Sequence, residues 1–153
     1  MTRYLEDCLV GQVEEFGRYL VSRDEVLRFA KDYDPQPFHL DDDAAAATYF
    51  GRLAASGWHT CAMTMRMMVD HWQAEGVQSL GSPGVEDLKW LVPVYPGDVL
   101  SVRQETLDVR ASRSRPEMGI VRARWSTVNQ NRVDVMSYSG AILVRRRPQP
   151  DRS

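Results

Sequence analysis

The spacing of apolar residues changes near residue 80, and this change divides the chain into a mainly helical part and a strand-rich part. Before this point, most apolar residues recur every three or four positions, which is the period of a helix with one buried face. A short apolar stretch precedes the first helix and is typical of a strand. The predicted elements of this part are a strand at 16–21 and helices at 22–34, 44–50 and 58–73.

Local signals mark both ends of the first predicted helix. Ser22 and Glu25 have the spacing of a capping box, in which the serine hydroxyl accepts a hydrogen bond from a first-turn amide and the glutamate reaches back. Pro35 disfavours helical geometry in the residue before it, so the helix is predicted to end at Asp34. A second proline, Pro37, stiffens the loop that follows.

After residue 80, apolar and polar residues alternate, as expected for strands with one buried face. Gly81–Gly84 is predicted to be a turn, and residues 129–132 are predicted to connect a hairpin. The predicted strand that begins at Ile120 has three apolar residues on one face and two arginines on the other. The predicted strands are 88–92, 99–109, 120–128 and 133–144.

The helix at 58–73 is apolar around most of its circumference. Trp58, Met65 and Trp72 lie on one stripe, and a second apolar stripe lies beside it, so the whole helix is predicted to be buried. An antiparallel sheet covers such a helix most economically by curling around it, which is an α+β arrangement. One sheet of this kind leaves a free edge and an uncovered face, so we expect two copies to associate as a homodimer or a multiple of it.

The composition is that of an ordinary globular protein. The 153 residues fit one domain, predicted at 1–147, followed by a flexible tail at 148–153. A net charge of −2 excludes a generally basic nucleic-acid binder. Residues 1–79 include 7 basic and 13 acidic residues, whereas 80–153 include 12 and 8, so an anionic ligand should prefer the second half.

Cysteine usage and the apolar segments predict a cytoplasmic protein without a membrane partner. Cys8 and Cys61 are too few and too distant for the disulfide framework of a small secreted domain, and free thiols are expected. Charged residues follow Met1 within a few positions, so no signal peptide is predicted. The longest apolar segment, 58–69, is interrupted by charge and is shorter than the ~20 residues that span a membrane.

The segment from Asp34 to His39 is the strongest candidate for a catalytic site. It places a carboxylate, the amide of Gln36 and an imidazole on one short loop, and a carboxylate and an imidazole can share proton transfer near neutral pH. The alternative is structural, with Asp34 ending the helix and His39 serving as a core histidine. The three carboxylates at 41–43 are interpreted as caps of the next helix, and no metal site is predicted.

This segment carries a family motif, which reads Asp, any residue, Asn, Pro, apolar residue, His. Here it stands as Asp34-Pro35-Gln36-Pro37-Phe38-His39, and Phe50-Gly51 and Ala55-Ser56-Gly57 follow it. With these residues the chain resembles the MaoC-like dehydratases and R-specific enoyl-CoA hydratases. The resemblance implies a hot-dog fold, in which a curved antiparallel sheet wraps a long central helix. It also implies an (R)-specific enoyl-CoA hydratase, or 3-hydroxyacyl-CoA dehydratase, that adds water to or removes it from an acyl-CoA thioester.

The resemblance also implies roles for individual residues. Asp34 and His39 match the pair that holds and activates the water and passes a proton to the α-carbon. Gly57 matches the glycine whose backbone amide stabilises charge on the thioester oxygen. No separate cofactor is expected, because CoA enters as part of the substrate, and arginines are the candidates for its phosphates. The residues expected to contact the acyl-CoA substrate are Gln36, Phe38, Ser56, Trp58, Arg113 and Arg115.

Three departures from the family pattern leave other functions open. Gln36 replaces the usual asparagine, Ser56 stands where many relatives have a histidine, and Met65 stands where the family has a hydroxyl on the long helix. A hot-dog acyl-CoA thioesterase would use Asp34 to direct water at the thioester carbonyl, and it would release free CoA. A non-catalytic acyl-CoA-binding subunit is the third alternative, and the departures at Gln36 and Met65 favour it.

Overall fold

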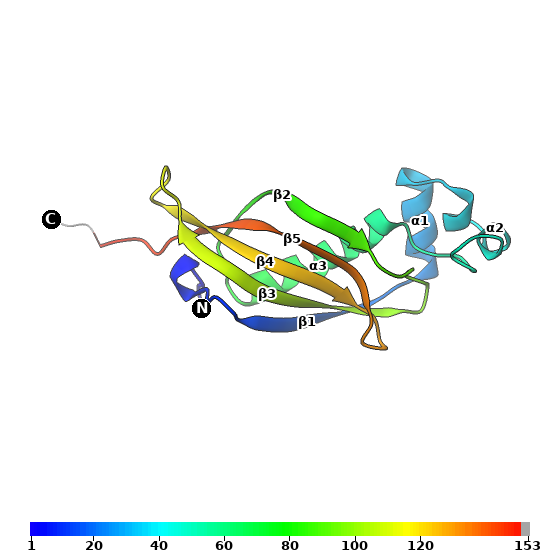
Figure 1. The fold of residues 1–153 in the computed structure, drawn as a ribbon, viewed down its shortest axis with the longest axis horizontal. Helices are drawn as coiled ribbons and strands as arrows, with labels where there is room; N and C mark the ends of the chain where they lie inside the picture. The colour runs from blue at the N-terminus through cyan, green and yellow to red at the C-terminus, as the bar shows by residue number, and fades with distance from the viewer. Residues whose placement is uncertain (151–153) are drawn as a thin grey trace.

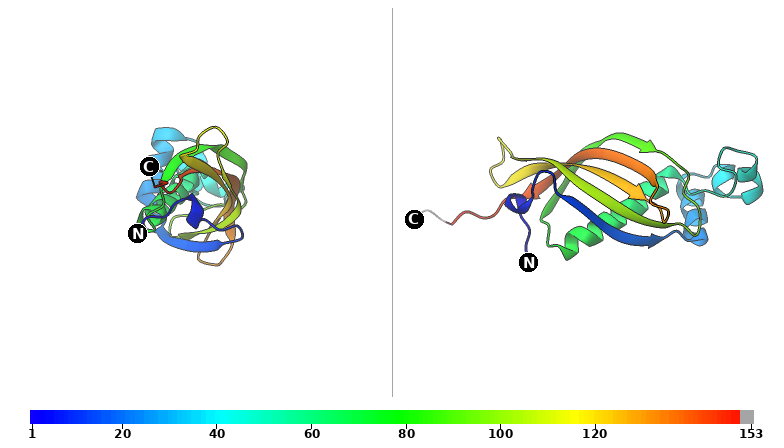
Figure 2. Two further views of the ribbon diagram at one scale, coloured as in Figure 1. Left: turned by 90° about the vertical axis from the view of Figure 1, so that its left-hand side faces the viewer. Right: turned by 60° about the horizontal axis from the view of Figure 1, so that its bottom comes forward.

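The computed structural model, which describes residues 1–150, has one long helix lying along the concave face of a five-stranded antiparallel sheet (Figure 1). The strands are ordered β1-β3-β4-β5-β2 across the sheet. Figure 2 shows the sheet curling around the helix, as the sequence predicts for an α+β arrangement. The elements are α3 (Gly57–Ala74), β1 (Val13–Leu20), β2 (Ser79–Trp90), β3 (Val99–Ala111), β4 (Met118–Val128) and β5 (Asp134–Arg145).

Short helices gather at one end of the molecule, around α1 and the start of α3 (Figure 1). The Ser22 hydroxyl accepts a 3.0 Å hydrogen bond from the amide of Glu25, which confirms the predicted cap. The Glu25 carboxylate does not complete the capping box but accepts from the hydroxyl of Tyr19. Asp34 ends the first helix, as Pro35 predicts. The helices at this end are α1 (Arg23–Tyr33), η2 (Pro37–His39) and α2 (Asp42–Ala46), whereas η1 (Leu5–Asp7) lies near the N-terminus at the other end of the molecule.

The second predicted helix is shorter than expected. Helical geometry ends at Ala46 rather than near Phe50, and turns follow up to Gly51, whose φ of +72° is unfavourable for other residues. The Asp41 carboxylate accepts a 2.9 Å bond from the amide of Ala44, so the interpretation of this acidic residue as a cap is confirmed.

The core lies between one face of α3 and the inner face of the sheet. Met63, Met67 and Met68 of α3 are buried there, so three of the four helix methionines fill the core. From the sheet side, Leu100 and Trp125 are among the most fully buried side chains. The alternation predicted for β3 and β4 is confirmed in the first eight residues of each strand, where buried positions alternate with partly or fully exposed ones, but the last four residues of β4, from Trp125 to Val128, are all buried.

The prediction that α3 is buried on almost all sides is wrong. The side chain of Trp58 is 59% exposed and that of Met65 is 46% exposed, because the sheet covers only one side of the helix. Residue types alone show that a helix face is apolar, but they do not show whether the same chain provides a layer to cover it. Among residues 1–150, no helix is both long and apolar enough to cross a bilayer.

The predicted turn at Gly81–Gly84 is also wrong, because these residues belong to β2. The strand pairs with β5 through three register shifts, two of which flank Gly81 and one of which follows Glu86. Gly81 has a φ of +109°, and this irregularity explains why the sequence has the composition of a turn there. β2 pairs only with β5 and therefore forms an edge of the sheet.

The C-terminal segment leaves the sheet after Arg145. Arg146 and Arg147 form ion pairs with Glu6 and Asp7 at 3.0 and 2.8 Å, so they still contact the body of the fold. The predicted flexible tail at 148–153 begins directly after them, and its residues 151–153 lie outside the described residues. The two cysteines, which were predicted to be free thiols, form no disulfide.

Candidate active site

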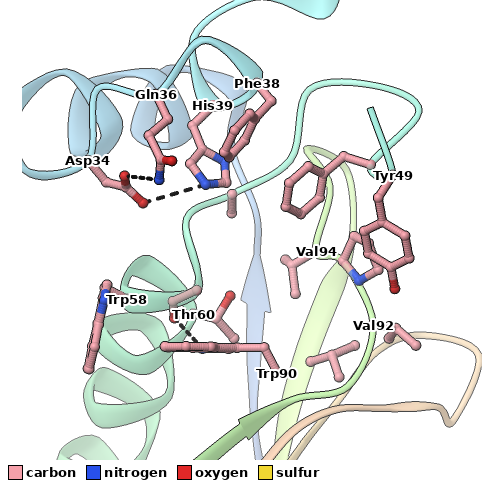
Figure 3. A pocket seen from close by; sticks show the side chains of 15 residues that line it. Asp34, Gln36, Phe38, His39, Tyr49, Trp58, Thr60, Trp90, Val92 and Val94 are labelled. Atoms are coloured by element: carbon pink, nitrogen blue, oxygen red, sulfur yellow. Dashed lines mark hydrogen bonds and ion pairs between the residues drawn. The ribbon is translucent and has the colours of Figure 1, made fainter. Parts of the chain in front are cut away.

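A cavity of about 410 Å³ lies at the N-terminal end of α3, where the loop after α1 meets the segment after β2 (Figure 3). One part of its wall is polar and the rest is aromatic and aliphatic, which is the usual make-up of a small-molecule site. Its lining residues are Asp34, Gln36, Phe38, His39, Tyr49, Phe50, Ala55, Gly57, Trp58, Thr60, Trp90, Val92, Pro93, Val94 and Val135.

The local sequence explains how Asp34 and His39 come to face the same cavity. Asp34 is the C-cap residue that follows α1, with a φ of −150° and a ψ of 67°, outside the helical region that the following proline disfavours. One turn of η2 then follows, held by a 2.9 Å bond from the amide of His39 to the carbonyl of Gln36. This tight connection brings a carboxylate and an imidazole that are five positions apart onto one side of the loop.

The Asp34 carboxylate and the His39 ring lie within reach of a shared proton or water. Asp34 Oδ2 is 3.5 Å from His39 Nε2, and Figure 3 shows the two groups turned towards each other. His39 Nδ1 lies 2.7 Å from the carbonyl oxygen of Ala54. A carbonyl can only accept, so Nδ1 carries the hydrogen, and the neutral ring presents a lone pair at Nε2.

Two neutral side chains hold the Asp34 carboxylate. Gln36 Nε2 donates to Oδ1 at 2.6 Å, and the Ser56 hydroxyl donates to Oδ2 at 2.7 Å. Partial burial by itself raises the pKa of Asp34, but the bonds from Ser56 and Gln36, together with the nearby His39 ring when it is protonated, outweigh it and lower the pKa below its ordinary value. Asp34 is therefore a carboxylate, and so a hydrogen-bond acceptor, at neutral pH.

Gly57 is the first residue of α3, and Trp90 covers it. The Trp90 indole donates from Nε1 to the Gly57 carbonyl at 2.9 Å. A Cβ on Gly57 would overlap the indole, so only glycine allows the ring to lie this close. The amides of the first helical turn have no carbonyl of their own helix to bond, and the Gly57 amide at the cavity wall is therefore a donor suited to negative charge.

The apolar wall of the cavity is mostly aromatic. Phe38 stacks on Phe50 with ring centroids 5.0 Å apart, and Trp58 meets Trp90 edge to face at 5.1 Å. Phe38 and Trp58 were expected at the substrate, whereas Trp90 and Phe50 were not. In the sequence Trp90 follows the alternating pattern of a strand, and no signal indicates that its indole packs on the start of α3.

The structure does not bring every expected site residue to the cavity. Asp34, Gln36 and His39 line it with Phe38, Gly57 and Trp58, as the list above shows. Arg113 and Arg115 lie in the connection between β3 and β4, which is at the opposite end of the molecule from α1 and α2 (yellow in Figure 1). The Ser56 hydroxyl bonds Asp34, and its side chain is not part of the cavity wall.

His59 lies two positions after Gly57 but faces away from this cavity. Its ring stacks on Phe29 of α1 with centroids 4.8 Å apart, in the packing between the two helices. Burial lowers the pKa of His59, which favours the neutral ring. Within residues 1–150, its Nδ1 is the buried side-chain nitrogen that has no hydrogen-bond partner. His59 therefore packs the two helices together and does not join the polar group around Asp34.

A long helix wrapped by a curved antiparallel sheet is the hot-dog fold, which this chain shares with a solved MaoC-like dehydratase. A family model for the MaoC-like domain matches residues 9–129. The chain therefore belongs to the MaoC-like domain family, and the resemblance noted in the sequence is confirmed.

Relatives of known sequence and structure extend this assignment over nearly the whole chain. The crystal structure of the MaoC-like dehydratase from Rhodospirillum rubrum matches with a TM-score of 0.87 and 41% identity, covering 96% of this chain and 99% of that one. Protein YdeM of Bacillus subtilis (strain 168) is 32% identical over 93% of this chain and 99% of its own length. A 3-hydroxybutyryl-CoA dehydratase of Methylorubrum extorquens is 28% identical over 75% of this chain and 71% of its own.

Proposed function

We propose that this chain is an (R)-specific enoyl-CoA hydratase, which in the reverse direction acts as a 3-hydroxyacyl-CoA dehydratase. The observation that carries the proposal is the 3.5 Å separation of Asp34 Oδ2 and His39 Nε2 at the wall of the cavity. Membership of the MaoC-like family and the similarity to a 3-hydroxybutyryl-CoA dehydratase support the same class of reaction.

In this proposal the pair orients one water molecule. The neutral His39 ring offers the lone pair of Nε2, and the Asp34 carboxylate offers a second acceptor. A water that donates to both acceptors turns an oxygen lone pair towards C3 of a bound enoyl thioester. The pKa of Asp34 lies below its ordinary value, and an imidazole is the stronger base, so His39 takes the proton of the water.

The bond changes of the proposed hydration balance without a further reactant. The water oxygen bonds to C3 as its O–H bond breaks, and the electrons of the 2,3 double bond move onto the thioester as an enolate. His39 then returns the proton to C2. Because oxygen and proton both arrive from the side of the Asp34–His39 pair, the addition is syn. The enolate oxygen accepts from the amide of Gly57, a fixed dipole of the kind that stabilises such charge.

The proposal includes a homodimer in the cytoplasm that takes an acyl-CoA thioester and no separate cofactor. β2 is an edge strand that exposes apolar side chains such as Leu80 and Val85, and the apolar face of α3 beside it is uncovered. Arg113 and Arg115 lie in the β3–β4 connection, at the end of the molecule opposite α1 and α2. In this proposal, their contact with CoA phosphates is therefore made across the dimer.

A panel of trans-2-enoyl-CoA esters tests the proposal. Hydration removes the absorbance of the conjugated thioester without releasing thiol, and chiral chromatography should identify the (R)-3-hydroxyacyl product. Asp34→Asn and His39→Ala should each lower the rate ~10²- to 10⁴-fold with circular dichroism unchanged. Asp32→Asn, an exposed carboxylate on the same helix, is the matched control and should keep the full rate.

The same assay separates the alternative functions. Thiol release in step with loss of absorbance would indicate a thioesterase, since hydration leaves the thioester intact. If no ester reacts and acyl-CoA still binds, the chain is a non-catalytic binding subunit. Full activity of the Asp34→Asn or His39→Ala variant would contradict the acid–base assignment.

A further inference from the structure

Ser56 contacts the Asp34 carboxylate but is not among the residues that line the cavity. Its side chain is 1% exposed, and its hydroxyl donates to Asp34 Oδ2 at 2.7 Å. The same oxygen faces His39 Nε2 at 3.5 Å. The Ser56 side chain does not line the cavity. Its hydroxyl therefore binds the Asp34 carboxylate rather than a substrate in the cavity.

The hydroxyl of Ser56 does not serve the helix either. Ser56 is the N-cap residue of α3, where a serine usually accepts a bond from an amide of the first turn. Here the side chain makes no capping bond. Ser22, the N-cap of α1, does cap its helix, so the two serines occupy equivalent positions and direct their hydroxyls differently.

We propose that Ser56 is a positioning residue, which fixes the orientation of the Asp34 carboxylate so that Oδ2 and His39 Nε2 hold the same water. The proposal deepens the hydratase function proposed above and rests on it. Gln36 holds the other carboxylate oxygen, so the group is fixed at both atoms and cannot rotate without losing a bond. Ser56, expected from the sequence to contact substrate, thus acts through Asp34.

The bond also favours the ionised form of the carboxylate. The titratable group that faces Asp34 is His39 of η2, while the neighbouring side chains from α3 and β2, including Ser56, Trp58 and Trp90, are uncharged. A hydroxyl that donates to a carboxylate favours its charged form, so removal of Ser56 Oγ should raise the pKa of Asp34. An ionised Asp34 leaves His39 as the group that accepts the proton of the water.

Steady-state kinetics of Ser56→Ala test the proposal, with Ser56→Thr as the variant that retains the hydroxyl. Ser56→Ala should lower kcat about 10- to 100-fold, the worth of a hydrogen bond to a charged group, while KM stays within about twofold. Ser56→Thr should restore most of kcat. Thr64→Val, which removes another buried hydroxyl of α3, is the matched control and should leave kcat unchanged.

A second measurement does not depend on activity. Carbon-13 NMR of labelled aspartate, with the Asp34 signal assigned by its absence in Asp34→Asn, should show a higher pKa for Asp34 in Ser56→Ala than in the wild type or in Thr64→Val. An unchanged Asp34 titration would overturn the proposal even if the wild-type protein proved not to be a hydratase. A raised KM with unchanged kcat would also overturn it, because this result would make Ser56 a substrate contact.

Discussion

Replacing Gly57 with alanine should disturb the start of α3 through a single contact, the one with Trp90. A Cβ at this position would lie 2.6 Å from Nε1 and 2.7 Å from Cδ2 of the indole, and closer still to Cε2. These separations are impossible for real atoms, so the ring must move. Its 2.9 Å bond to the Gly57 carbonyl is then lost. The backbone of Gly57 is not in the left-handed region, so the substitution adds no conformational strain.

The free-energy change of this substitution can be worked out from its parts. Overpacking costs about 1–3 kcal/mol, and the lower end applies because Trp90 is 46% exposed and can swing outward. The lost hydrogen bond adds about 0.5–1.5 kcal/mol. A less flexible unfolded chain offsets about 0.4–1 kcal/mol of this cost. Gly57→Ala should therefore lower the free energy of unfolding by about 1–2 kcal/mol.

A double-mutant cycle with Trp90→Ala, followed by urea unfolding, tests this account. In the Trp90→Ala background the overlap and the indole bond are both gone. Gly57→Ala should then change sign and stabilise the protein by about 0.4–1 kcal/mol. The reasoning is refuted if Gly57→Ala destabilises both backgrounds equally, because the glycine would then be needed for a reason other than the indole.

Three further predictions concern the core, a buried histidine and the edge strand. Gln104→Leu should lower the free energy of unfolding by about 2–5 kcal/mol in urea, because its Oε1 accepts from the buried indoles of Trp72 and Trp125 and both would be left unpaired. The pKa of His59 is lowered in the folded state, so the unfolded chain takes up a proton more readily and the free energy of unfolding of the wild type falls as pH drops below about 6.5. His59→Phe should lessen this fall, and an equal dependence of unfolding free energy on pH in both proteins would contradict the prediction. Light scattering at micromolar concentration should give a dimer mass that Val85→Lys on β2 halves, and a monomeric wild type would refute the dimer.

Local sequence signals predicted those parts of the fold that neighbouring residues decide. Ser22 and Pro35 fix the two ends of α1, and alternation fixes the inward faces of β3 and β4. The errors arise where partners are distant in sequence. Glycines in β2 have turn-like composition, yet pairing with β5 keeps the segment in the sheet as an irregular strand. The apolar residues of α3 predicted that its exposed stripe is buried, because no local pattern indicates which layer covers a helix.

The candidate site divides in the same way. The motif from Asp34 to His39 predicted that these two side chains lie together at one site, because its prolines and short spacing determine the loop locally. Trp90 and the role of Ser56 were not predictable, since each depends on a contact 22 or more residues away in sequence. The arginines at 113 and 115 were chosen by charge alone, and charge does not tell at which end of the sheet a hairpin lies.

One short segment, residues 54–57, connects the three groups that the proposed reaction needs. The carbonyl of Ala54 sets the tautomer of His39, the hydroxyl of Ser56 holds the Asp34 carboxylate, and Gly57 lines the cavity. The segment is itself fixed, because the amide of Ala55 bonds the carbonyl of Val94 at 2.8 Å and the side chains of 54–56 are buried. A backbone shift here would disturb the proposed base, carboxylate and oxyanion donor together, so the proposed reaction depends on the rigidity of this segment as well as on the motif.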